Sequence, residues 1–300
     1  MVAREKASLR RLQFSSVLCS QLPRTSANSP PMLPHSMRTG LTSWNYRTRR
    51  QLRIVAQEIY QQARVSPQRN FVFLHVPKAG GTSIRHFFRD IFLERSIFPE
   101  DRLSNFPLWE DVSSEGPKAY LGHLGWAFAR SARAETATVL RDPIERLLSV
   151  YVYASKAMLR QPLIGMDSSQ MSLIQFLEST QVGIRQNIDN AQTWQLCHCY
   201  HWEQREKLAE TSDQTIFRAA SENLEKIDWL GVSENLSEFC KRLSMSKIQT
   251  EKNAPRRNVS SGRLSYSGLS DREKKAMHKC TEMDVALYEK ARHRLACGPR

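Results

Sequence analysis

The sequence predicts an α/β fold in which a central parallel sheet is flanked by helices. Short apolar runs that suit buried strands alternate along the chain with segments whose apolar residues recur at helical spacing. Two of the predicted strands run directly into a turn-forming motif and then into a helix, and no internal repeat is found. Such alternation is typical of parallel sheets, because two parallel strands are joined by a crossover that is usually a helix.

The first predicted strand is the most distinct one. Residues 71–76 form a short, mostly apolar and β-rich run, as expected for a buried parallel strand. Residues 77–81 are rich in proline and glycine, which interrupt regular structure. From Thr82 onward the apolar residues share one helical face, and a further helical stripe over residues 51–64 precedes the strand. The unit is therefore strand, glycine loop and helix.

The pattern recurs along the rest of the chain. Strands are expected at residues 119–121 and 136–140, and a helix follows the second of them to about Met158. Asp142 is a good N-cap for that helix, and Pro143 suits its first turn. The remaining expected elements are helices over residues 171–210, a strand over 229–232, a helix over 235–245 and a long helix over 270–295 capped by Ser270 or Asp271.

Length and charge predict one main domain behind a basic leader. A chain of 300 residues can bury one substantial core. The formal net charge is +14, and residues 1–50 contribute nine Lys or Arg against one Glu. We expect residues 1–50 to be a disordered basic segment, with a transit peptide or a wrongly chosen start codon as alternatives. Residues 51–300 are expected to form a single domain with a helical insertion at about residues 155–215.

The composition also excludes several classes of protein. No run of 18 apolar residues occurs, so we expect no transmembrane segment and a cytoplasmic location. The basic excess suits anionic ligands, but no nucleic-acid-binding motif accompanies it, so no nucleic acid partner is expected. Cys197, His198, Cys199 and His201 lack a second ligand pair at zinc-finger spacing. We therefore expect no metal, and cysteines that are reduced rather than arranged in a disulfide framework.

The first chemical motif is the glycine loop after the strand at 71–76. It reads His75-Val76-Pro77-Lys78-Ala79-Gly80-Gly81-Thr82-Ser83-Ile84. A loop of this kind at a helix N-terminus turns backbone amides toward one point, where a phosphate or sulfate group fits. Lys78 adds a full positive charge, and Thr82 and Ser83 add hydroxyl donors. Lys78 precedes the glycines, whereas the lysine of a Walker loop follows them, so the pattern disfavours an ordinary ATPase or kinase.

The second chemical motif follows the strand at 136–140. It reads Arg141-Asp142-Pro143-Ile144-Glu145-Arg146-Leu147-Leu148-Ser149-Val150-Tyr151. Arg141 lies at a strand's carboxyl end, where open α/β sheets bind their ligands. Ser149 follows about two helical turns later on the same face, and Arg146 is expected to join it. An arginine and a hydroxyl suit a second phosphate, although Arg-Asp-Pro alone also describes a capped helix start.

Together the two motifs resemble those of the PAPS-dependent sulfotransferases, where PAPS is 3'-phosphoadenosine 5'-phosphosulfate. The resemblance is to the Golgi-type carbohydrate branch, which includes heparan sulfate 2-O-sulfotransferase. It implies a P-loop-like three-layer fold, PAPS as the donor, and a hydroxyl-bearing acceptor that is a saccharide. The first motif would hold the 5'-phosphosulfate, and Arg141 and Ser149 would hold the 3'-phosphate. Asn190-Ala191-Gln192-Thr193 and Leu230-Gly231-Val232-Ser233-Glu234 are similar to two weaker motifs of the family.

The resemblance also implies a catalytic base. His123 follows Gly122 at the end of the strand at 119–121, and the similar enzymes carry a proposed base there. A histidine with a near-neutral pKa can take the proton of an acceptor hydroxyl. The alternative is a structural histidine held by a backbone carbonyl. Glu145 and His86 are weaker candidates, and His75 is expected to orient the loop.

A basic, turn-rich stretch at residues 252–260 is the last candidate element. The similar enzymes close a loop here over the nucleotide, so Arg256 and Arg257 are expected at the 3'-phosphate, unless they belong to a solvated charge run. Two other functions remain open: a P-loop kinase, and a non-catalytic nucleotide- or glycan-binding relative. The similar animal enzymes are Golgi membrane proteins, which is the alternative location. The sequence leaves the oligomeric state open.

Overall fold

The computed structural model describes most of the chain beyond its first fifth. The described residues are 64–99, 116–157, 171–199, 205–206, 208, 210–253 and 264–298. All of them belong to one compact unit, Gln57–Arg300. The basic segment at residues 1–50 and nearly all of the helix expected over 51–64 lie outside the described residues.

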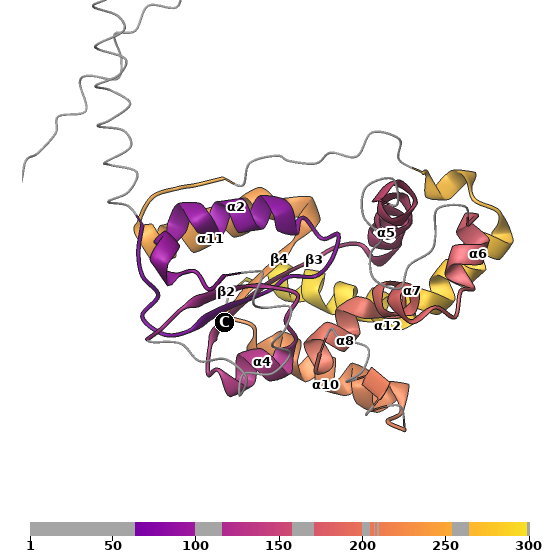
Figure 1. Ribbon diagram of the computed structural model, residues 1–300, viewed down its shortest axis with the longest axis horizontal. Helices are drawn as coiled ribbons and strands as arrows, with labels where there is room; N and C mark the ends of the chain where they lie inside the picture. The colour runs from indigo at the N-terminus through magenta and orange to yellow at the C-terminus, as the bar shows by residue number, and fades with distance from the viewer. Residues whose placement is uncertain are drawn as a thin grey trace, which may run out of the picture. The chain divides into compact units, whose positions relative to one another are not determined.

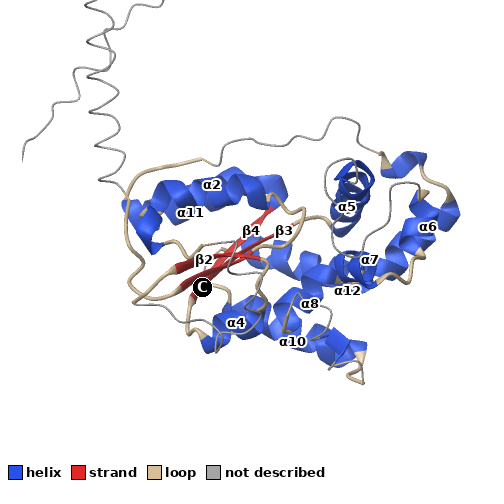
Figure 2. Ribbon diagram, in the orientation of Figure 1, coloured by secondary structure: helices blue, strands red, loops and turns tan. Residues whose placement is uncertain are grey.

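Four parallel strands form the central sheet in the order β2-β1-β3-β4. They are β1 (Phe71–Leu74), β2 (Ala119–Gly122), β3 (Glu135–Leu140) and β4 (Trp229–Val232). Each lies where the apolar runs of the sequence predicted a strand. Figure 2 shows the strands stacked between helices on either side. The α/β class, with a central parallel sheet flanked by helices, is therefore confirmed.

The strand register brings three chain segments to one edge of the sheet. Leu74, the last residue of β1, lies beside Gly122 of β2 and Thr138 of β3. Because the strands are parallel, the loop after β1, the turn after β2 and the segment after β3 all leave from this edge. This is the edge at which open α/β sheets bind ligands.

Alternate residues of β1 point into two different cores. Phe71 and Phe73 belong to the core under α2 and α11, whereas Val72 and Leu74 belong to the core on the opposite face. A strand that is buried on both faces needs such a continuous apolar run. Figure 1 shows α2 and α11 on one side of the sheet and α4, α8 and α10 on the other. The bounds are α2 Gly81–Ile91, α11 Leu236–Ile248, α4 Trp126–Ser131, α8 Ala191–Cys197, α10 Asp213–Lys226 and α12 Asp271–Ala296.

A third apolar core lies beside the sheet and is entirely helical. It joins α5 (Pro143–Ala157), α6 (Leu173–Leu177) and α7 (Val182–Ile188) to the first half of α12. Short 3₁₀ turns complete the described elements, at Glu94–Ser96, Ser233–Asn235 and Tyr266–Gly268. Within the parts of the chain that the structure describes, no helix combines the length and apolar character needed to cross a membrane.

The sequence predicted where two helices begin, but it predicted the number and the lengths of the helices less well. The Asp142 side chain accepts a hydrogen bond from the Glu145 amide at 2.9 Å, so it caps α5 as predicted. Ser270 caps α12 in a reciprocal capping box with Glu273. The helical region expected over 171–210 is divided into short helices, and the sequence analysis predicted neither α4 nor α10.

Candidate active site

The loop between β1 and α2 has the backbone geometry of an anion-binding turn. Gly80 adopts φ 89° and caps α2, and Lys78 adopts φ 67°. Left-handed backbone is uncommon for a non-glycine residue, and such residues cluster at ligand sites. The first amides of α2 have no acceptor within the helix, and the helix dipole is positive at this end. The loop can therefore bind a phosphate or sulfate group.

His75 and Gly81 explain why the loop needs its second glycine. A Cβ atom at Gly81 would lie 1.5 Å from Nε2 of His75, so no larger residue fits there. His75 is buried. Its burial, with the nearby charges of His123, Arg85 and Lys78, holds the pKa of His75 well below its usual value. A neutral imidazole therefore packs against the start of α2, as expected of a residue that orients the loop.

Lys78 extends from the loop toward α5. Its Nζ lies 4.0 Å from the ring centroid of Tyr153, which is a cation–π contact. Burial, and then the charge of Arg141, lower the pKa of Lys78. Tyr153 was not among the predicted site residues, although its place four residues after Ser149, about one helical turn, was a signal in the sequence.

Arg141 joins the two chemical motifs. Its Nη1 donates to the carbonyl oxygen of Lys78 at 3.0 Å, across 63 residues of sequence. Its Nη2 lies 3.6 Å from Oε2 of Glu145, one turn into α5. The Arg141 guanidinium thus bonds the backbone of Lys78 at the carboxyl edge of the sheet, and it lies close enough to the Lys78 side chain to lower the pKa of that lysine. Such an arrangement favours an anionic ligand.

Gln192 holds the backbone of Arg141 from both sides. The Arg141 amide donates to Oε1 of Gln192, and Nε2 of Gln192 donates to the Arg141 carbonyl oxygen, both at 3.0 Å. Gln192 is fully buried, so this pair of bonds is shielded from water. The sequence analysis placed Gln192 in a weak family motif without assigning it this role.

The rest of that motif ties α8 to α12. The Asp284 carboxylate accepts hydrogen bonds from the amides of Gln192 and Thr193, and from the Thr193 hydroxyl. The Asn190 side chain accepts from two amides of α12, those of Met283 and Asp284. These contacts position Gln192, and through it Arg141.

The sequence predicted that Arg146 would join Ser149 at the candidate anion site. This prediction is wrong, because Arg146 lies in the core. Its side chain is fully buried, its Nη2 donates to the Asn187 carbonyl oxygen at 3.0 Å, and it lies 3.8 Å from Asp284 Oδ2. Arg146 lies one turn before Ser149 on α5, but tertiary packing turns it inward. Ser149 itself is half-buried on α5.

His123 lies exposed on the turn that follows β2. Its Nδ1 is 2.8 Å from the His75 carbonyl oxygen, and the two rings stack with centroids 4.3 Å apart. A carbonyl oxygen accepts, so Nδ1 donates, and in the neutral ring the lone pair lies on Nε2. Gln195 donates to the same carbonyl oxygen at 3.1 Å. A backbone carbonyl therefore holds the ring, as the structural alternative expected, and in this tautomer Nε2 has the lone pair that a general base would use.

The other candidates lie in different places. Glu145 lies beside Arg141, and His86 is half-buried on α2. Arg256 and Arg257 lie outside the described residues.

Burial raises the pKa of the Cys197 thiol to about 11. Among the residues that the structure describes, no group of three His, Cys, Asp or Glu side chains is placed to hold a metal ion.

A comparison with protein families decides the identity of this fold. The profile of the sulfotransferase family matches residues 61–291. The chain belongs to the sulfotransferase family. A search of curated proteins finds no match. The family match makes the protein a transferase of sulfuryl groups, and the matched region of this sulfotransferase includes the loop at Lys78, His123, Arg141 and Asp284.

Proposed function

We propose that this sulfotransferase moves the sulfuryl group of PAPS to a hydroxyl group of a carbohydrate. The observation that carries the proposal is the contact between Arg141 Nη1 and the Lys78 carbonyl oxygen, which joins two cationic motifs at the carboxyl edge of the sheet. PAPS carries anionic groups at both the 5' and the 3' position of its ribose. Two adjoining anion sites, rather than one, suit such a donor.

In this proposal the two motifs divide the donor between them. Lys78, Ala79, Gly80, Gly81, Thr82 and Ser83 bind the 5'-phosphosulfate, through the α2 amides, the lysine charge and the hydroxyls. Arg141 and Ser149 bind the 3'-phosphate, and Arg256 and Arg257, which lie outside the described residues, complete this site. A site for the 3'-phosphate gives selectivity for PAPS over ATP, which lacks that group.

The proposed reaction is a direct transfer. An acceptor oxygen attacks sulfur while the bond from sulfur to the 5'-phosphate oxygen breaks, so a sulfate ester and adenosine 3',5'-bisphosphate form. His123 takes the proton of the acceptor hydroxyl on Nε2. Lys78 and the loop amides stabilise the charge on the sulfuryl oxygens and on the departing phosphate. Lys78 and His123 are thus the proposed catalytic residues, and the step needs no metal.

The proposed domain is residues 51–300, and its acceptor side is the helical insertion at about 155–215. The described helices α6, α7 and α8 lie in that insertion. The resemblance to the Golgi-type branch, and to heparan sulfate 2-O-sulfotransferase in particular, supports a saccharide as the acceptor.

Calorimetry tests the donor site first. Adenosine 3',5'-bisphosphate and ATP are titrated into the wild type, Arg141→Ala and Arg130→Ala, an exposed arginine of α4 that serves as the control. We expect the bisphosphate to bind far more tightly than ATP, and Arg141→Ala to weaken it about 10- to 100-fold, since a hydrogen bond to a charged group contributes about 1.5–3 kcal/mol.

Other outcomes point to other functions. A preference for ATP, or binding that is indifferent to Arg141, would overturn the proposal in favour of a P-loop kinase. Bisphosphate binding without sulfuryl transfer from labelled PAPS to any saccharide or other hydroxyl acceptor would select the non-catalytic binding protein.

A further inference from the structure

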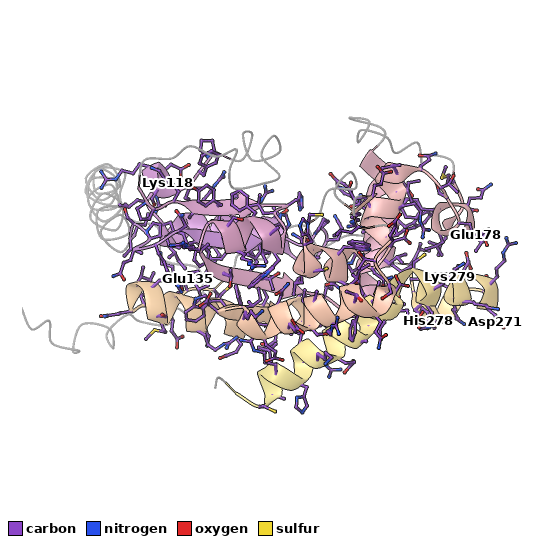
Figure 3. The ribbon with its side chains drawn as sticks, turned by 90° about the horizontal axis from the view of Figure 1, so that it is seen from below. Lys118, Glu135, Glu178, Asp271, His278 and Lys279 are labelled. Carbon is purple, nitrogen blue, oxygen red and sulfur yellow. The ribbon has the colours of Figure 1, made fainter. Side chains whose placement is uncertain are left out.

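A second basic site lies away from the loop and Arg141. A cleft of about 560 Å³ opens between the end of α6, the turn that follows it and the first half of α12. None of its lining residues belongs to the β1–α2 loop, to β2 or to α5. In Figure 3, Glu178 and Lys279, which line it, lie at the same end of the molecule as Asp271, the first residue of α12.

One wall of the cleft is a stripe of like charge on α12. Arg272, Lys275 and Lys279 line the cleft at spacings of three and four residues, so they share one face of the helix. Like charges at these spacings destabilise a helix, and a cation in the first turn also opposes the helix dipole. The stripe therefore works against the stability of α12 itself. An anion in the cleft would offset that repulsion.

The opposite wall neutralises part of this charge but not all of it. Arg185 pairs with Asp189 on its own helix, and Arg272 pairs with Glu178 at 2.8 Å. Among the described residues, neither Lys275 nor Lys279 forms an ion pair, and both side chains are exposed. Exposed pairs such as Arg272–Glu178 contribute at most about 1 kcal/mol, so a ligand anion can displace that carboxylate.

The size and floor of the cleft indicate what kind of anion it takes. Leu177, Ala276 and Cys280 supply an apolar floor, and Ser179 and Thr180 supply hydroxyls. Its volume is in the range of about 300–1,000 Å³ that is usual for small-molecule sites. An inorganic ion would leave most of that space and the floor without contacts.

From these features we infer that the α6–α12 cleft binds a small organic polyanion, with two or more sulfate, phosphate or carboxylate groups on a carbon framework. Lys275, Lys279 and Arg272 contact the anionic groups, and the apolar floor contacts the framework. This inference is independent of the proposed donor site and base, because none of the residues assigned to the donor or to the acceptor proton lines the cleft. The wall formed by Leu177–Thr180 and Arg185 belongs to the insertion proposed as the acceptor side.

The test uses sucrose octasulfate as the probe and calorimetry on the full chain. The titration is run with and without one equivalent of adenosine 3',5'-bisphosphate, which occupies the proposed donor site and leaves no excess to fill the cleft. A wild type that fails to bind the bisphosphate reports on the proposed function alone. Lys275→Gln/Lys279→Gln is compared with Lys226→Gln/Lys290→Gln, which removes the same charge from exposed positions elsewhere. We expect the cleft variant to bind the probe about five- to tenfold more weakly, and the control to stay within about twofold of the wild type.

Three results would overturn the inference. Equal weakening in both double variants would mean that the probe follows net charge alone. Unchanged binding in the cleft variant would place the probe elsewhere. Inorganic sulfate that binds as tightly as the octasulfate would remove the need for an organic framework. Thermal unfolding of the variants adds a separate check: relief of repulsion should leave the melting temperature of the cleft variant equal to or above that of the wild type, and a lower one would make the lysines structural.

Discussion

The two ends of β3 carry charged clusters that differ in how their charges are paired. At the amino end, Glu135 is largely buried, and both its oxygens lie 2.6 Å from Lys247 Nζ, while Oε1 also accepts from Trp229 Nε1. At the carboxyl end, Arg141 and Lys78 bring two cations together, and burial lowers the pKa of Lys78.

The difference separates a structural cluster from the candidate ligand site. Each charge at the Glu135 end has a partner within the protein, as a buried charge requires. At the Arg141 end, the cations face the edge at which the sheet binds ligands, beside a helix start that is also positive. Arg141 pairs there with the half-exposed Glu145, and Lys78 contacts the exposed ring of Tyr153. Because these partners are exposed, substitutions at the two ends should affect different quantities.

The largest effect is expected for His123→Ala at the ligand end. If His123 is the general base, as proposed, its loss lowers the rate of transfer by about 10²- to 10⁴-fold. The substitution also removes the hydrogen bond to the His75 carbonyl oxygen and the ring stacking, so we expect a loss of stability of about 1 kcal/mol, while the affinity for adenosine 3',5'-bisphosphate should stay within about twofold. Steady-state kinetics with PAPS and calorimetry measure the three quantities, with the exposed His293→Ala as the control. Transfer within tenfold of the wild type would assign the proton to another group.

At the opposite end, Lys247→Met should lower stability and leave nucleotide affinity intact. The substitution leaves the Glu135 carboxylate largely buried without its cation, and we expect a loss of about 1–2 kcal/mol, discounted from the cost of a fully buried pair. Urea unfolding measures it. Lys241→Met breaks the exposed pair with Glu251 and should cost less than about 0.5 kcal/mol. Equal losses in the two variants would show that the Glu135 cluster has no special structural role.

Gln192→Met tests whether the backbone of Arg141 must be held for the ligand end to work. Methionine is close in size but cannot bond the Arg141 amide and carbonyl. We expect binding of the bisphosphate to weaken about five- to tenfold, together with a loss of stability of about 1–3 kcal/mol.

Asn223→Leu is the matched control, because Asn223 is a buried amide that bonds the carbonyls of Leu196 and Cys197 on α8. It should lose stability and keep its affinity for the bisphosphate. Similar affinities in the two variants would make Gln192 purely structural.

The most gradual effect is a pH dependence of stability that comes from His75. Its folded-state pKa lies below the ordinary value of 6.5, so the unfolded chain takes up a proton first as the pH falls. The contribution of neutral His75 to the free energy of unfolding should be fully present above pH 6.5. Below pH 6.5 it should decline by up to about 1.4 kcal/mol per pH unit, until the pH reaches the pKa of His75 in the folded protein. Urea unfolding between pH 8 and pH 5 measures this decline. His75→Asn should have a smaller slope, and an unchanged slope would assign the effect to other groups.

Much of the fold followed from local sequence patterns. The apolar run at Phe71–Leu74, the glycines after it and the apolar face of α2 are signals within about 20 residues, and the structure has strand, loop and helix there. Asp142 and Ser270 act as caps for the same reason, since a cap bonds an amide only a few residues away. The six-residue helix α4 was missed because so short a segment shows little periodicity. The stripe of Ile216, Ala220 and Leu224 on α10 was a signal that was available but not used.

The sequence by itself determined the order of the four strands, the glycine loop with the helix after it, and the sulfotransferase family, because these depend on residues close together in the chain. Tertiary structure alone decided which side chains share a site. It placed Arg141 against Lys78, set Gln192 against the backbone of Arg141, and turned Arg146 into the core toward Asp284. These contacts join residues about 50 to 140 positions apart. Their partners are selected by the packing of the helices around the sheet, which local spacing does not encode.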